Sequence, residues 1–255
     1  MIRIKTPEEI EILREGGRRH SDILAEIAKL IVPGISTQTL EDFTRKLIQE
    51  GGDTSAFLGY RPRGAKRPYP AALCVSVNNE IVHGIPNESP TILQEGDIVS
   101  LDLGLTHKGL ITDSAITVGV GKIKKEDGNL IKHCKEALAL GIKAAKGGGH
   151  VGDIGHAIES FVRPLGYGLC QGLAGHGVGF RVHEDPFVPN EGSKGEGEIL
   201  RSGMVIAIEP MITLGTDKIV LSSDGFTYKT ADGSNAAHFE HTIAITDGEP
   251  VVLTK

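Results

Sequence analysis

The sequence predicts an α+β protein whose strands pair antiparallel and whose helices cover one face of the sheet. Amphipathic helical segments come first and β-like segments follow, and this order occurs twice along the chain. Such runs favour an α+β architecture, whereas strict alternation of strand and helix would favour a parallel sheet. The length of 255 residues suits a single domain, residues 1–255, with one sizeable core. A functional site would then lie on the concave face of the sheet, opposite the helices.

Four helices are predicted from capping residues and from apolar positions at helical spacing. The first opens with Thr6 as N-cap, Pro7 at the first helical position and Glu9 as the partner in a capping box. Pro33-Gly34 and Gly51-Gly52 end the first and second helices, because proline and glycine disfavour helix continuation. The three later helices are predicted over residues 37–50, 129–145 and 153–162.

A faint repeat relates the two halves of the chain at one constant offset. Four positions near the second helix find small or apolar counterparts near the fourth, namely Gly34, Leu40, Leu47 and Gly52 against Gly148, Ile154, Phe161 and Gly166. By itself this correspondence is weak evidence for two related halves.

Five β-like segments are predicted over residues 71–77, 97–105, 110–119, 204–212 and 240–246. The second and third are joined by a turn-like stretch and form a hairpin. If His107 and Lys108 are its tip, Asp102 and Asp113 lie directly opposite each other, although a bulge would shift this register by one residue. Opposed carboxylates repel unless a proton or a cation lies between them, and a divalent metal is the simpler resolution. The alternative is that one aspartate only caps a turn.

Three further segments add candidate metal ligands. Glycines flank His176 on both sides, as expected where the backbone approaches a metal or a substrate closely. Glu209 ends one apolar segment and Glu240 heads another, where a lone charge is costly to bury. Each glutamate taken alone is more often a solvated strand end than a metal ligand. The coincidence of five such positions favours a metal site.

Composition argues against several classes of function. Charged residues make up 24% and the formal net charge is −6, so no global positive field suggests nucleic acid or an anionic membrane as the main partner. No apolar run approaches the roughly 18 residues that span a bilayer, and the start lacks the apolar stretch of a signal peptide. We therefore expect a cytoplasmic protein. Three widely separated cysteines, Cys74, Cys134 and Cys170, argue against a disulfide framework and against a thiolate zinc site.

In order and nearly in spacing, these segments resemble the type I methionine aminopeptidases, hydrolases with the pita-bread fold, over essentially the whole chain. The resemblance implies two divalent metal ions bridged by Asp113 and Glu240, with Asp102 completing one site and His176 with Glu209 completing the other. Cobalt, manganese, iron or zinc would suit this oxygen-rich set. The implied reaction removes the initiator methionine from nascent proteins whose second residue is small, through metal-activated attack of water on the first peptide bond. Pseudo-twofold halves, which this fold implies, would account for the repeat.

The resemblance also assigns groups that act on the substrate. His83 matches the family's histidine near the scissile amide, and His183 matches the one that binds the intermediate or the substrate carbonyl. Glu240 would handle the proton transfer. The remaining histidines match no family position and are expected mostly at the surface or behind the ligands: His20, His107, His133, His150, His156, His238 and His241. His241 should point to the strand face opposite Glu240.

In the family a shallow apolar pocket receives the methionine side chain, and the matching positions are Phe57, Tyr60, Cys74, Val182, Met211 and Phe226. A core role is the alternative for each. The loop 61–70 is longer than in well-known bacterial members and carries Arg61, Arg63, Lys66 and Arg67. It is interpreted as a solvated Pro-rich loop, with contact to nascent chains or ribosomal RNA as the alternative. The implied partners are the N-terminal methionine of nascent polypeptides and, transiently, the ribosome, and the protein is expected to be a monomer.

Two alternatives to this function remain open. A proline-specific aminopeptidase or dipeptidase of the same fold would share all five ligands, but such enzymes usually carry a large N-terminal domain for which this chain has no room. A pita-bread binding module that has lost catalysis would lack ligands, and all five are present here.

Overall fold

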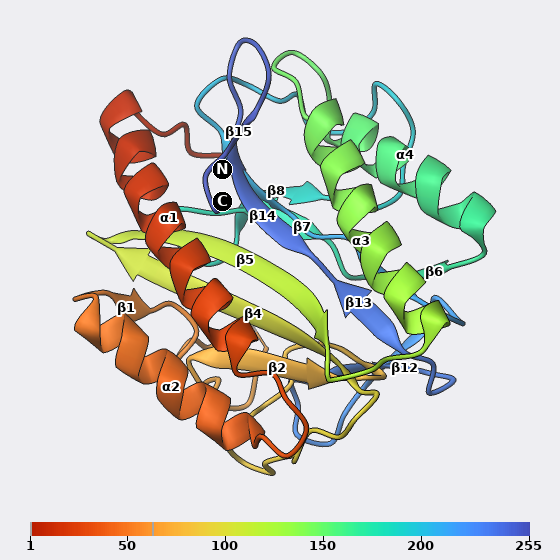
Figure 1. The fold of residues 1–255 in the computed structure, drawn as a ribbon. Coiled ribbons are helices and arrows are strands. Elements are labelled where there is room, and N and C mark those ends of the chain that lie inside the picture. The colour runs from red at the N-terminus through yellow and green to blue at the C-terminus, as the bar shows by residue number, and fades with distance from the viewer. Residues whose placement is uncertain (1, 63) are drawn as a thin grey trace.

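Figure 1 shows the fold in a computed structural model, which describes residues 2–62 and 64–255. Its elements are, in chain order, α1 Pro7–Lys29, α2 Thr37–Glu50, β1 Thr54–Ser55, β2 Leu73–Val77, β3 Glu80–Val82, β4 Ile98–His107, β5 Leu110–Gly119, α3 Lys125–Ala144, α4 Val151–Val162, the 3-10 helix Arg163–Leu165, β6 Gly168–Leu169, β7 Gly175–Gly177, β8 Glu184–Val188, β9 Val205–Ile208, β10 Met211–Thr213, β11 Ile219–Leu221, β12 Tyr228–Thr230, β13 Ala236–His238, β14 Glu240–Ala244 and β15 Val251–Val252.

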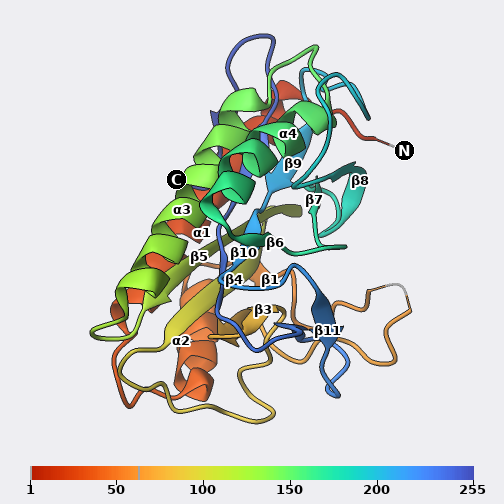
Figure 2. The ribbon, with the colours of Figure 1, turned by 90° about the vertical axis from the view of Figure 1, so that its right-hand side faces the viewer.

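The strands form one large sheet and two small ones, and every pair is antiparallel. The large sheet has the order β1-β4-β5-β14-β9-β7-β8, with β2 added on β4 and β15 on β14. The small sheets have the orders β13-β10-β6 and β11-β12-β3. In Figure 2 the helices lie on one side of the large sheet, whereas β8 and β11 lie toward the other. The predicted α+β class, with antiparallel pairing and helices on one face, is confirmed.

Each pair of helices covers its own half of the sheet and buries its own core. Leu24 of α1 and Leu40 of α2 pack with Leu101 of β4 in one apolar cluster. Leu138 of α3 and Ile154 of α4 belong to a second cluster, which includes strands β9 and β14. Among the described residues, no helix combines the length and the apolar character needed to cross a membrane.

The faint sequence repeat corresponds to matching local structure in the two halves. Gly34 and Gly148 precede α2 and α4 with φ angles of 92° and 84°, a conformation that glycine adopts without strain. The Gly34 amide donates to the Leu93 carbonyl at 2.8 Å, and the Gly148 amide donates to the Leu200 carbonyl at 2.8 Å. Each helix is therefore held at its start by a later segment of its own half, the one that leads into β4 for α2 and the one that leads into β9 for α4.

The predicted helix starts hold for α1 and α2 and are late for α3 and α4, and α1 ends at Lys29, before the predicted break at Pro33-Gly34. Thr6 and Glu9 form the expected capping box of α1. Helix α3 begins at Lys125, where no side chain caps the preceding Lys124, and Gly128 lies in its first turn. A helix start without a capping side chain leaves little trace in the sequence, because capping is the local signal on which the prediction depends.

The register predicted for the β4–β5 hairpin is wrong. Its two-residue tip is Lys108-Gly109, with φ angles of 47° and 82°, as a tight hairpin turn of this type requires. Asp102 therefore pairs with Ala115, and Asp113 pairs with Gly104. The two aspartates are diagonal neighbours on one face of the sheet and not directly opposite, because the slip of two positions keeps every side chain on its original face.

The single strand predicted over residues 204–212 is also wrong, because Glu209 and Pro210 divide it into β9 and β10. Proline has no N–H to donate to a sheet ladder and therefore favours a break. Strand β9 pairs with β14 in the large sheet, whereas β10 pairs with β13 and β6 in a small one. The chain changes sheets at Glu209, and this places the carboxylate at the junction.

Candidate metal centre

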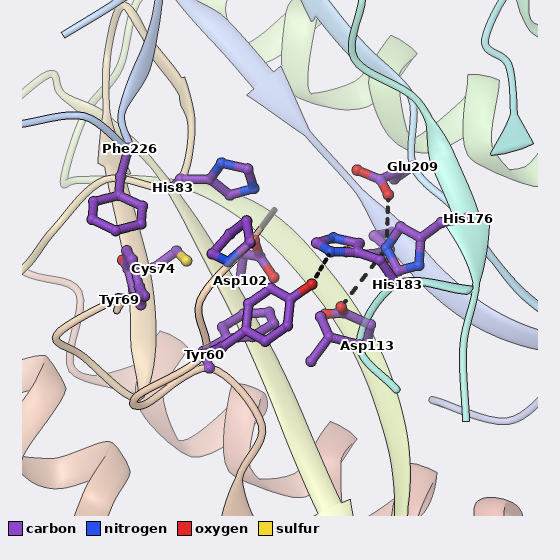
Figure 3. A pocket seen from close by; sticks show the side chains of 14 residues that line it. Tyr60, Tyr69, Cys74, His83, Asp102, Asp113, His176, His183, Glu209 and Phe226 are labelled. Atoms are coloured by element: carbon purple, nitrogen blue, oxygen red, sulfur yellow. Dashed lines mark hydrogen bonds and ion pairs between the residues drawn. The ribbon is translucent and has the colours of Figure 1, made fainter. Parts of the chain in front are cut away.

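Five consecutive strands of the large sheet each bring one predicted ligand to the same region. In the order β4-β5-β14-β9-β7, these are Asp102, Asp113, Glu240 at the first position of β14, Glu209 directly after β9, and His176. Figure 3 shows Asp102, Asp113, Glu209 and His176 around one cavity, which Glu240 also lines. Residues far apart in the sequence thus meet because their strands are neighbours.

Strand alternation separates these polar side chains from the apolar core. In β4, Leu101 and Leu103 are fully buried in the core beneath α1 and α2, and Asp102 between them faces the cavity. In β14, the Nδ1 atom of His241 lies 2.9 Å from the Thr254 hydroxyl, on the side away from Glu240, as expected. One face of the sheet therefore makes the core and the other makes the site.

The ligand atoms are close enough to share cations. The Nε2 atom of His176 lies 3.3 Å from an oxygen of Glu209 and 3.9 Å from an oxygen of Asp113. Two groups each have all their ligand atoms within 4.8 Å of one another: Asp113, His176 and Glu240, and Glu209, His238 and Glu240. Glu240 belongs to both groups.

The charge and hydrogen bonding of the site fit divalent cations. Within the described residues, Oδ1 of Asp102, Oδ1 of Asp113 and Oε1 of Glu240 are buried without a hydrogen-bond partner. Burial raises the pKa of Asp102 to about 7 and raises the pKa values of Asp113 and Glu240 well above their usual range, and neighbouring carboxylates raise the latter two further. Unpaired anionic oxygens at this density need protons or cations between them.

A second layer of hydrogen bonds fixes the backbone of the acids. The Thr242 hydroxyl accepts from the Asp113 amide at 2.8 Å and donates to the Asp113 carbonyl at 2.7 Å. The Ser114 hydroxyl donates to the Glu240 carbonyl at 2.7 Å, and the Asn190 side chain donates to the Glu209 carbonyl at 3.0 Å. These contacts hold the repelling carboxylates in place before any cation binds.

We expect the cation-free protein to lose stability as the pH rises from about 6.5 into the alkaline range. The buried carboxylates have raised pKa values, so they stabilise the fold while protonated and lose this contribution as the pH passes through their folded-state pKa values. Buried histidines with lowered pKa values, such as His176 at about 3, act in the opposite direction, but only below their unfolded value of roughly 6.5. Melting temperatures with chelator should fall across this window and should stay nearly level with saturating Mn²⁺. If the melting temperature fell equally steeply with pH in chelator and in Mn²⁺, the buried carboxylates would not be the cause of the loss of stability.

His238 was missed as a site residue. It is 1% exposed, and its Nε2 atom lies 3.7 Å from Glu209 and 3.8 Å from Glu240. Burial lowers its pKa to about 3, so its ring is neutral, and neither ring nitrogen has a hydrogen-bond partner among the described residues. Its position two residues before Glu240 was the available signal, because alternate residues of an extended segment share a face.

The expectation that the unmatched histidines lie mostly at the surface or behind the ligands needs correction for two others. His20 is 0% exposed and its Nδ1 lies 3.1 Å from the Thr112 hydroxyl. His107 is buried with its Nδ1 at 2.7 Å from Asp53. Both lie between α1 and the β4–β5 hairpin, where each element covers polar side chains of the other.

His83 and His183 line the same cavity as the acids. The His183 ring stands at 80° to the ring of His176, with centroids 4.4 Å apart, and its Nδ1 lies 2.9 Å from the Tyr60 hydroxyl (Figure 3). Burial lowers the pKa of His83 to about 4 and also lowers the pKa of His183. Both imidazoles are therefore neutral near pH 7 and can each donate one hydrogen bond.

An apolar wall faces the charged cluster across the cavity. Phe226, Tyr69 and Cys74 lie together on this wall in Figure 3. Five predicted pocket residues line the cavity, namely Phe57, Tyr60, Cys74, Val182 and Phe226. Tyr69 and Pro62 also line it and were missed, because no local pattern distinguishes them from other loop residues.

The sixth predicted pocket residue, Met211, does not line this cavity. It is 1% exposed and packs with Ile81, Val82 and Cys170 in a separate apolar cluster. The sheet change at Pro210 turns the chain away from the cavity directly after Glu209, so the core alternative applies to Met211.

Two basic side chains of the loop 61–70 bind groups of the same chain. Arg61 donates to the carbonyls of Ala65 and Lys66 within the loop, and Arg67 binds the carboxylate of Glu88. Arg63 lies outside the described residues. Two of the predicted basic side chains are thus engaged by intramolecular partners, which favours the structural interpretation over a phosphate-binding surface.

Comparison with known proteins places this site among metallopeptidases. Residues 11–247 match the model of metallopeptidase family M24. The chain is 45% identical to the methionine aminopeptidase of Aquifex aeolicus over 258 residues, covering 100% of this chain and 99% of that relative. It is 40% identical to methionine aminopeptidase 1 of Bacillus subtilis, with 100% of both chains covered.

Solved structures give the same picture. A methionine aminopeptidase from Thermotoga maritima is similar with a TM-score of 0.95 and 42% identity, covering 100% of both chains. A prolidase from Pyrococcus furiosus is similar with a TM-score of 0.76 at 23% identity, covering 99% of this chain and 65% of that chain. The second likeness concerns the fold alone.

Proposed function

The chain belongs to metallopeptidase family M24, and from this membership and the geometry of the cavity we propose the following function and residue roles. The enzyme removes the N-terminal initiator methionine from nascent proteins whose second residue is small, by metal-activated attack of water on the first peptide bond. Full-length relatives named methionine aminopeptidase support this activity. The single observation that carries it is the apolar wall of Phe226, Tyr69 and Cys74 directly across one cavity from the buried acids. Such a pocket can receive one unbranched apolar side chain of a substrate, while the backbone carbonyl of the same residue lies beside the metal ligands.

The pita-bread fold is shared with prolidases, yet the alternatives are less well supported. The prolidase likeness stands at 23% identity and spans 65% of the prolidase chain. The Thermotoga structure, in contrast, matches over its whole length. A binding module without catalysis would not need five ligand residues converging with unpaired buried oxygens.

We propose that Asp102, Asp113, His176, Glu209 and Glu240 hold two divalent cations, with Asp113 and Glu240 shared between them. When bound, the cations supply Lewis acidity that polarises the scissile carbonyl and activates water. Cobalt, manganese, iron and zinc all suit four carboxylates and one imidazole. Glu240 belongs to both ligand groups, where its carboxylate can accept the proton of the attacking water and pass it to the leaving amine.

His183 and His83 are proposed to bind the substrate. The Tyr60 hydroxyl lies 2.9 Å from Nδ1 of His183, and burial raises the pKa of this phenol so that it keeps its proton. If Tyr60 donates to Nδ1, the proton of neutral His183 resides on Nε2 and can stabilise the developing charge on the substrate carbonyl. His83, placed by a φ angle of 61° at the end of β3, is proposed to contact the scissile amide.

Replacing His183 or His83 with alanine should keep both cations and lower turnover by about 100-fold, since each imidazole is proposed to donate to the substrate and not to the metals. Tyr60→Phe should give a smaller loss, because it removes the group that fixes the tautomer but leaves the ring of His183. The measurement pairs metal content by atomic spectroscopy with kcat on a Met-Ala peptide. Loss of one equivalent of metal in either histidine variant would reassign that residue as a ligand.

We further propose that residues 1–255 act as one catalytic unit and that the enzyme is a monomer. The nature of the substrate supports the location and the partner: nascent chains emerge in the cytoplasm, so the enzyme would act there and contact the ribosome transiently. Sedimentation of the enzyme alone tests whether it is a monomer, and sedimentation with translating ribosomes tests the ribosome contact.

The decisive test of the function uses the cation-loaded enzyme on three peptides of equal length that begin Met-Gly, Met-Ala and Ala-Pro. Release of methionine from the first two, with the third left intact, is the expected result. Cleavage of the proline peptide alone would establish the prolidase alternative, and no cleavage of any peptide would support the binding module.

A further inference from the structure

Arg67 contacts the apolar wall of the cavity from outside. Its guanidinium carbon lies 5.1 Å from the centroid of the Phe226 ring. Phe226 in turn meets Tyr69 edge-on, with centroids 5.3 Å apart at an interplanar angle of 80°. Phe226 and Tyr69 both line the cavity. Arg67 therefore touches the pocket through a wall residue.

Polar contacts to two other segments orient the Arg67 guanidinium. Nη1 and Nη2 donate to the two carboxylate oxygens of Glu88, the second at 2.7 Å, and Nη2 also donates to the Asp224 carbonyl at 3.2 Å. The side chains of Arg67 and Glu88 are 38% and 42% exposed, so the ion pair by itself adds little stability. Its effect is geometric, because a planar fork bound at both nitrogens cannot rotate away from the ring beneath it.

The Asp224 segment is the turn that carries Phe226. The Asp224 carboxylate accepts from the amides of Phe226 at 2.7 Å and Thr227 at 2.9 Å, which makes the turn a rigid unit. The strand before it is open to solvent, with Val220 48% and Leu221 53% exposed. Arg67 ties this turn to the remainder of the pocket.

The base of the loop 61–70 is closed by two main-chain hydrogen bonds. The Gly59 amide donates to the Tyr69 carbonyl at 2.9 Å, and the Tyr69 amide donates to the Tyr60 carbonyl at 2.8 Å. Arg67 and Tyr69 are thus two positions of one closed segment, and both contact Phe226. The loop 61–70 therefore contacts the Phe226 ring through two of its side chains, Arg67 and Tyr69.

We propose that Arg67 is a positioning residue that sets substrate specificity: by holding Phe226 in the wall, it fixes the width of the pocket for an unbranched first side chain. The inference rests on the proposed function, because the side chain in the pocket is the first residue of the substrate. A pocket with a loose wall would bind methionine less tightly and would discriminate less against branched leucine.

The test compares Arg67→Ala and Arg67→Lys with Arg61→Ala, a matched control in the same loop whose guanidinium binds the Ala65 and Lys66 carbonyls. Kinetics use the cation-loaded full chain on Met-Ala-Ser and Leu-Ala-Ser. Arg67→Ala should raise KM for Met-Ala-Ser about tenfold with kcat within about twofold, and should shrink the preference for methionine over leucine by a similar factor. Lysine should restore only part of this, because it lacks the planar fork. The control should match the native enzyme.

The salt dependence of KM and the binding of methionine distinguish a positioning role of Arg67 from a general loss of structure in Arg67→Ala. Raising the salt concentration should increase KM of the native enzyme and leave that of Arg67→Ala unchanged, because only the native enzyme has the exposed ion pair to screen. Glu88→Gln should raise KM in the same direction, and combining it with Arg67→Ala should add little. Calorimetry with methionine as the probe should show about tenfold weaker binding to Arg67→Ala, whether or not peptides are cleaved.

Two results would overturn the inference: an unchanged KM and methionine preference in Arg67→Ala, or an equal change in Arg61→Ala. Failure of the native enzyme to cleave Met-Ala-Ser would instead contradict the proposed function, and methionine binding to the two variants would still decide the role of Arg67.

Discussion

Alanine at Glu240 or at Asp113 is expected to reduce kcat/KM on a Met-Ala peptide by at least about a thousandfold. Glu240 belongs to both groups of converging ligand atoms, and Asp113 belongs to one of them with an unpartnered buried oxygen. Removing either carboxylate takes away a proposed shared ligand. The remaining carboxylates then repel each other with less cationic charge to separate them.

His241→Asn is the matched control for Glu240→Ala. It alters the adjacent position of the same strand, but its side chain contacts Thr254 on the other side of the sheet. The control should keep cation stoichiometry and activity, measured by calorimetric titration with Mn²⁺ and by peptide cleavage. Near-normal turnover of Glu240→Ala or Asp113→Ala with full metal content would rule out the shared-ligand arrangement.

Peptides beginning Met-Ala and Met-Gly are expected to be cleaved at least about 100-fold more efficiently than Met-Leu or Met-Ile peptides. Phe57 and, from the loop 61–70, Pro62 line the cavity together with the acids. The Phe57 ring also lies so close to Gly104 that a Cβ at that glycine would be 2.6 Å from it, which shows how tightly the ring is packed. A bulky second side chain would collide with this wall and lift the scissile carbonyl away from the metals.

Phe57→Ala should relax this discrimination by raising kcat/KM for Met-Leu while that for Met-Ala changes little. The measurement is a competition assay with equimolar Met-Ala and Met-Leu peptides, read by mass spectrometry. Arg61→Ala serves again as the control for general loop effects. Equal cleavage of Met-Ile and Met-Ala by the native enzyme would refute the narrow entrance.

The features that the sequence determined by itself are local or periodic. The capping box of Thr6 and Glu9 is complete within four residues, so the start of α1 needs no information from the remainder of the chain. The alternation of Leu101, Asp102 and Leu103 divides one strand between core and site, because strand periodicity fixes the face of every side chain. The four carboxylate candidates could be named because charges inside apolar strands are costly without a partner, and His176 because glycines flank it.

Only the tertiary structure decided how those strands meet. The hairpin tip at Lys108-Gly109 set the diagonal placement of the aspartates, and the break at Pro210 sent Met211 into a different core. His238 and Arg67 gained their positions from contacts with segments distant in the sequence, Glu209 for the first and Glu88 with Asp224 for the second. Such contacts depend on which strands and loops become neighbours, and local propensity carries no information about that choice, because its free energy comes from packing across the whole fold.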